Sequence, residues 1–77
     1  MERYYFDTHY GQCTLTDPET GVSLTWEPGK FNETNRGAVE PLSTLHTETD
    51  AGRLAERLAH IMREMADYAR ANYAELL

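Results

Sequence analysis

The sequence holds one cysteine and no long apolar run. With only Cys13 among its 77 residues, the chain cannot form an internal disulfide, which suits a reducing compartment. No apolar stretch approaches the roughly 20 residues that cross a bilayer, and residues 1–4 lack the apolar segment of a signal peptide. We therefore expect a cytoplasmic protein that makes no membrane contact.

Basic residues are scarce in the N-terminal part of the chain. Residues 1–50 contain nine acidic and three basic side chains, whereas residues 51–77 contain four of each, so the first part carries the whole net charge of −6. Direct nucleic-acid binding requires bases that neutralise phosphates, and an anionic membrane would repel these acids. The charge instead favours a protein partner with a basic surface, and no direct binding of nucleic acid.

Alternating apolar and polar residues predict a hairpin. Residues 12–16 and 22–26 alternate, and the Asp, Pro and Gly between them suit a turn that ends in a glycine bulge. The residues expected on the core face of this hairpin are Cys13, Leu15, Val22, Leu24 and Trp26. Its other face then presents hydroxyl groups: Thr14, Thr16, Ser23 and Thr25.

Further strands are expected on either side of the hairpin. Residues 3–10 predict an earlier strand with Tyr4, Phe6, Thr8 and Tyr10 on one face and Tyr5, Asp7 and His9 on the other. Residues 27–30 predict a type II turn at Pro28–Gly29, residues 31–37 a polar loop, and residues 38–40 a short fourth strand before Pro41.

The remainder predicts one long helix over residues 47–76. Thr47 and Asp50 have the spacing of a capping box, no proline follows, and apolar residues recur three and four apart. A helix of about 27 residues is roughly 40 Å long, whereas a short strand spans only about 17–20 Å. The surplus apolar residues need a bend of the chain, a second copy or a target to cover them. If a second copy covers them, the candidate dimer contacts are Met65, Tyr68, Tyr73 and Leu76.

Together these patterns predict an α+β fold. A three- or four-stranded antiparallel sheet precedes one long C-terminal helix that packs on one of its faces. The chain is then a single domain, residues 1–77, with the sheet and its loops in 1–45 and the helix in 47–76.

No pattern of catalytic or metal-binding residues stands out. His9 and Cys13 match no common zinc spacing, and the alternation places Cys13 on the core face, where a thiol acts as a small apolar group. We expect no metal, no cofactor and no catalytic residue, and therefore not an enzyme.

The outer face of the sheet is the expected binding surface. Such a face is often only solvated, but here acidic loops surround it. The candidate partner-binding residues are Tyr5, Asp7, Asp17, Glu19, Glu27, Glu33 and Glu40.

These acids around a short sheet give the chain a resemblance in size, charge and layout. It resembles the small inhibitors encoded by phages and other mobile elements, including anti-CRISPR proteins and DNA mimics. The resemblance implies that carboxylates dock, in place of phosphates, on the basic surface that a target complex uses for nucleic acid. The alternative is a homodimeric structural or regulatory module without nucleic-acid mimicry.

Overall fold

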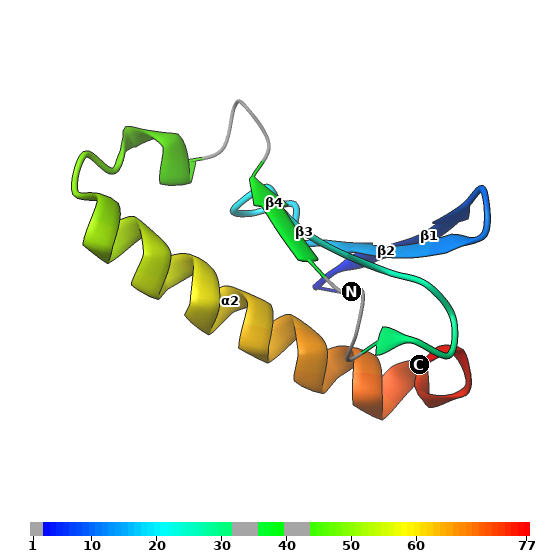
Figure 1. Cartoon of the computed structure of the whole chain (residues 1–77). Helices are drawn as coiled ribbons and strands as arrows, with labels where there is room; N and C mark the ends of the chain where they lie inside the picture. Colours follow the sequence, from blue (N-terminus) through cyan, green and yellow to red (C-terminus); the bar gives the residue numbers. More distant parts are fainter. Residues whose placement is uncertain (1–2, 32–35, 40–43) are drawn as a thin grey trace.

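Four strands form one antiparallel sheet in the spatial order β1-β2-β3-β4 (Figure 1). The structure is a computed structural model, and it describes residues 3–31, 36–39 and 44–77. The strands are β1 (Tyr5–His9), β2 (Gln12–Thr16), β3 (Val22–Trp26) and β4 (Arg36–Val39). The predicted limits of both hairpin strands are confirmed, and the fourth strand begins at Arg36, two residues before its predicted start.

One long helix packs against a single face of the sheet, so the predicted α+β fold is confirmed. The helical elements are the 3-10 helix η1 (Thr44–Thr47), the α-helix α2 (Ala51–Asn72) and the 3-10 helix η2 (Ala74–Leu76). Among the strands, α2 contacts chiefly β3, one of the two inner strands (Figure 1). None of the described helices is long and apolar enough to span a membrane.

The helix begins later than the sequence predicts. Asp50 is its N-cap, because its Oδ1 accepts hydrogen bonds from the amides of Gly52 at 2.9 Å and Arg53 at 3.2 Å. Thr47 belongs instead to η1, so the expected capping box between Thr47 and Asp50 is wrong. Three residues separate the two elements, and the carboxylate of Asp50 satisfies the amides of the first turn of α2.

The turn after β3 has the predicted type II geometry. The Lys30 amide donates to the Glu27 carbonyl at 2.9 Å, and Gly29 has a φ of 83°. The segment that follows was expected to be polar loop, but Phe31 is buried. Its ring meets that of Trp26 edge-on at 5.1 Å, and the Arg70 guanidinium lies 5.4 Å from its centre. Phe31 thus closes the core between the sheet and the end of the helix.

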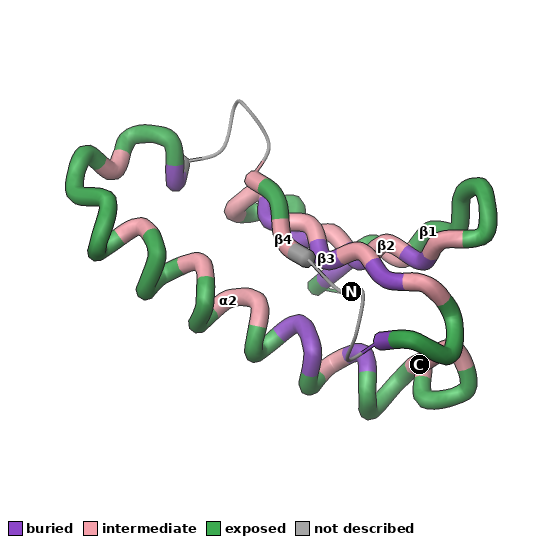
Figure 2. Tube along the Cα trace, viewed as in Figure 1, coloured by how far each residue is buried: buried purple, intermediate pink, exposed green. Residues whose placement is uncertain are grey.

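The core lies under the C-terminal half of α2. Figure 2 shows buried residues only in that half of the helix, and they are Met65, Ala66 and Ala69. In the N-terminal half the apolar residues Leu54, Leu58 and Ile61 are only partly buried. Among the described residues the helix therefore extends beyond the tightly packed core at its beginning, whereas the sequence predicted an overhang at its end.

The apolar end of the helix is covered by its own chain. Met65 is fully buried, so its predicted role as a dimer contact is wrong. The other predicted dimer contacts are partly buried against the same core. The Tyr68 ring meets Tyr4 edge-on at 4.8 Å, and the Tyr73 ring stacks on Phe6 at 4.1 Å.

A bend after Asn72 produces this cover. Tyr73 leaves the helix with a φ of −130°, and the chain turns through η2 beneath the sheet. The Leu76 carbonyl then accepts a hydrogen bond from the Trp26 indole N–H at 3.0 Å. Of the three covers that the sequence allowed for, the structure shows the bend.

Candidate functional site

The outer face of the sheet, defined here as the side away from α2, carries no described helix (Figure 1). The strand register arranges its residues in rows across the sheet. One row holds Tyr5, Thr16, Ser23 and Ala38, and the next holds Asp7, Thr14, Thr25 and Arg36. The predicted outward direction of the hydroxyl residues is confirmed, since the residues that alternate with them on β2 and β3 are buried.

Hydroxyl groups pair across the middle of the outer face. The Oγ1 atoms of Thr14 and Thr25 lie 3.4 Å apart, and Thr16 Oγ1 lies 3.3 Å from Ser23 Oγ. Cross-strand pairs of this kind hold the side chains in place but leave their remaining lone pairs and methyl groups toward solvent. The centre of the face is therefore an uncharged strip of hydroxyl groups that can form hydrogen bonds with a molecule bound there.

Two tyrosines are the exposed large hydrophobic residues of the described chain. Tyr5 is 66% exposed on β1, where the prediction placed it, and Tyr10 is 94% exposed. The sequence predicted that Tyr10 would share the inner face with Tyr4 and Phe6, and this is wrong. Tyr10 and Gly11 instead form the two-residue turn between β1 and β2, with φ values of 50° and 76°.

Asp7 blocks part of the open edge of the sheet. Its Oδ1 accepts a hydrogen bond from the Thr8 amide at 2.9 Å. In a hairpin closed by a two-residue turn, His9 and Gln12 form a hydrogen-bonded pair, so the Thr8 amide points away from β2. The carboxylate thus occupies a donor that an added strand would need, which favours side-chain contact over strand addition at this edge.

Asp17 is a folding residue rather than a partner contact. It is fully buried, and its carboxylate accepts from the Glu19 amide at 3.0 Å and the Thr20 hydroxyl at 2.9 Å. Arg3 adds an ion pair at 3.3 Å, and the negative charge of Asp17 raises the pKa of the Arg3 guanidinium. Because it is fully buried, Asp17 does not present its carboxylate to a partner as predicted.

The other predicted acids differ in how they are placed. Glu19 is exposed, with Oε2 lying 3.1 Å from Arg3 Nη1, and Glu27 lies 3.6 Å from Lys30 Nζ. Exposed pairs of this kind contribute about 0–1 kcal/mol, so they exchange readily for the bases of another protein. Glu33 and Glu40 lie outside the described residues.

Cys13 lacks the setting of a nucleophile. The thiol is fully buried, and burial raises its pKa, which disfavours the reactive thiolate. Within the described ranges, no three His, Cys, Asp or Glu side chains come together as a metal site would require.

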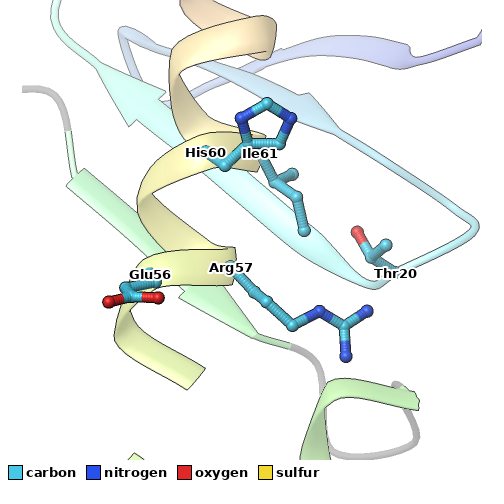
Figure 3. A pocket seen from close by; sticks show the side chains of 5 residues that line it. All are labelled: Thr20, Glu56, Arg57, His60 and Ile61. Carbon is cyan, nitrogen blue, oxygen red and sulfur yellow. The ribbon is translucent and has the colours of Figure 1, made fainter. Parts of the chain in front are cut away.

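A pocket of about 360 Å³ lies between the N-terminal half of α2 and the β2–β3 turn (Figure 3). It is lined by Thr20, Glu56, Arg57, His60 and Ile61. In Figure 3 the side chains of Arg57 and Ile61 extend toward Thr20, whereas Glu56 points away from it.

Three polar residues of this pocket, Thr20, Arg57 and His60, have partners within the chain. Arg57 pairs with Glu48 at 3.8 Å, His60 with Glu64 at 3.0 Å, and Thr20 with Asp17 at 2.9 Å. Among the described residues no buried side-chain nitrogen or oxygen lacks a hydrogen bond. Nothing in the pocket therefore selects a ligand, and we place the candidate site on the outer face.

Comparison with known proteins gives no relative. No protein-family model, no curated protein and no solved structure matches the chain.

Proposed function

We propose that this chain is a protein-binding inhibitor that docks the outer face of its sheet on a basic surface of a partner. Where that surface binds nucleic acid, the docked domain blocks it by occupying the space and by charge. The observation that carries the proposal is the ordered outer face, which no described helix covers and which lies in the part of the chain, residues 1–50, that holds the entire net charge of −6.

Charge indicates the kind of partner. The described side chains of residues 3–50 include six acids and two bases, whereas those of 51–77 balance. Long-range attraction from such an excess speeds the encounter with a basic protein, and the hydroxyl strip then supplies hydrogen bonds at short range. The acids best placed to stand in for phosphates are Asp7, Glu19 and Glu27, since Asp17 is buried.

The competing proposal is a homodimeric module. It was based on surplus apolar residues at the end of the helix, but these residues pack within the chain itself. The residues that suggested it pack against Tyr4, Phe6 and Trp26 of the same chain. We therefore expect a monomer of 8.8 kDa in sedimentation. A stable dimer at micromolar concentration would restore the alternative.

The test begins with capture of the partner. The full chain is immobilised on a resin and incubated with a nuclease-treated cytoplasmic extract of its host. Bound proteins are then eluted with rising salt and identified by mass spectrometry. The purified partner is then titrated at two salt concentrations. We expect affinity to fall about tenfold from low to physiological salt, because screening weakens exposed charge pairs.

A matched pair of variants tests whether the interface lies on the outer face of the sheet. Thr25→Lys puts a long cation in the middle of the outer face, and Ala71→Lys puts the same cation on the exposed side of α2. Affinity should drop about tenfold or more for the first and change less than about twofold for the second. Equal effects, or none for Thr25→Lys, would contradict the proposal.

A further inference from the structure

Tyr10 adopts a backbone conformation that suits glycine or asparagine. Its φ is 50°, and that of Gly11 is 76°, so both central residues of the β1–β2 turn are left-handed, as a type I′ turn requires. In that region a Cβ atom crowds the neighbouring carbonyl, and a bulky residue is an outlier. Gly11 meets the demand of the turn, but Tyr10 does not.

Core packing gives no reason for a tyrosine here. The Tyr10 side chain is 94% exposed, and its ring lies beside that of His9, with the ring centres 4.2 Å apart and the planes inclined by 59°. His9 is itself exposed. Backbone preference and burial thus both disfavour tyrosine at this position, and strain without a folding benefit is a feature of binding and active sites.

The turn is placed where another molecule can reach it. In Figure 1 the tip of the β1–β2 hairpin projects away from α2, and Figure 2 shows it exposed throughout. The residues of this tip are Thr8, His9, Tyr10 and Gly11, all of them exposed. His9 lies two residues along β1 from Asp7 and shares its side of the strand, so the tip continues the outer face of the sheet.

We propose that Tyr10 is the anchor of the interface and inserts into an apolar pocket with a cationic rim on the basic partner. The inference rests on the proposed function and names its central contact. Tyrosine buries a large ring with few torsions to fix, and it is among the residues that dominate binding energy at interfaces. The face of the ring attracts Lys and Arg, which suits the partner that the net charge of −6 selects.

His9 prepares the Tyr10 side chain for this role. With the two ring centres 4.2 Å apart, the imidazole restricts the positions of the phenol ring in the free protein. A side chain that is already restricted loses less freedom on binding.

Photochemical crosslinking tests the contact in the full chain. A photoreactive phenylalanine derivative replaces Tyr10 in one variant and Ala71 in a matched control, and both are irradiated in the host cytoplasm. We expect a protein adduct from position 10 only, mapped by mass spectrometry to apolar residues next to Lys or Arg. Equal adducts from both positions, no adduct, or an adduct with nucleic acid would overturn the inference.

Affinity measurements separate this inference from the proposed function. With the crosslinked partner purified, Tyr10→Asn should weaken binding about 30-fold or more, and Tyr10→Phe about threefold or less. Circular dichroism of Tyr10→Asn checks the fold, which asparagine in this turn should preserve. If Thr25→Lys weakens binding and Tyr10→Asn does not, the docking face stands and the anchor is wrong. If neither weakens binding, both proposals fail.

Discussion

The turns at the two ends of β2 differ in what their residues stabilise. In the β2–β3 turn, Asp17 is fully buried and joined to Glu19, Thr20 and Arg3, and Gly21 takes the left-handed position with a φ of 77°. In the β1–β2 turn, a 94% exposed tyrosine takes a left-handed position. Asp17 and Gly21 in the β2–β3 turn therefore serve the fold, whereas Tyr10 in the β1–β2 turn does not.

This difference is the reason for placing function at one end of the sheet. A residue that weakens the fold is expected to persist where it contributes to something else. Because the two turns belong to adjacent hairpins of one sheet, they can be compared by the same measurements. We expect substitutions in the β2–β3 turn to lower stability and a suitable substitution in the β1–β2 turn to raise it.

The largest effect is expected from Asp17→Ala. It leaves the Glu19 amide and the Thr20 hydroxyl without their acceptor and Arg3 without its buried partner. Loss of charged hydrogen bonds at a buried site should lower the free energy of unfolding by about 3 kcal/mol, measured by urea denaturation. The control Asp67→Ala removes an exposed pair with Arg70 and should change it by about 0.5 kcal/mol or less. Similar values for the two variants would remove the contrast.

A second prediction concerns alkaline pH and two buried ionisable residues of the core, Tyr4 and Cys13. Burial raises the pKa values of Tyr4 and Cys13 above their ordinary values, so the folded chain retains these protons to higher pH than the unfolded chain. The contribution of these two groups to the free energy of unfolding should therefore be constant below the ordinary cysteine pKa, and it should be lost as pH rises through the ordinary and then the raised pKa of each group.

Two substitutions check the source of this dependence. Tyr4→Phe and Cys13→Ala remove the two ionisable groups, so each should flatten the loss of stability seen in urea melts between about pH 8 and 11. A decline that is as steep in the double variant as in the parent would assign it to other groups.

The smallest expected change is a gain. Tyr10→Asn relieves the left-handed strain and gives the turn a favoured residue, and it removes a ring that the core does not use. The free energy of unfolding should rise by about 0.5–1 kcal/mol, and the melting temperature by a few degrees. A loss of stability in thermal denaturation would mean that the tyrosine serves the fold after all.

Period-two patterns explain why much of the sheet was predictable. The alternation over 12–16 and 22–26 fixed both the strand limits and the buried faces, because a shift by one residue would expose the apolar set. The helix was predicted with less accurate ends. The capping-box spacing indicated Thr47 as the cap, and only the folded chain shows that the Asp50 carboxylate accepts from the first amides.

The candidate site was less predictable, since it depends on contacts distant in sequence. Asp17 looked like one surface acid among many, because the sequence does not show that Arg3, 14 residues away, pairs with it. Tyr10 was missed because strand alternation extended to it. The residue that could have indicated the turn is Gly11. Because the next strand begins at Gln12, a two-residue turn that includes Gly11 must also include Tyr10.

Hydrogen–deuterium exchange of the full chain, with and without its purified partner, tests the docking surface most directly. Amides of the β1–β2 hairpin, residues 5–16, should exchange more slowly in the complex, whereas those of the exposed beginning of α2, residues 51–62, should be unchanged. Protection of α2 with no change in the hairpin would contradict the central claim that the outer face of the sheet binds the partner.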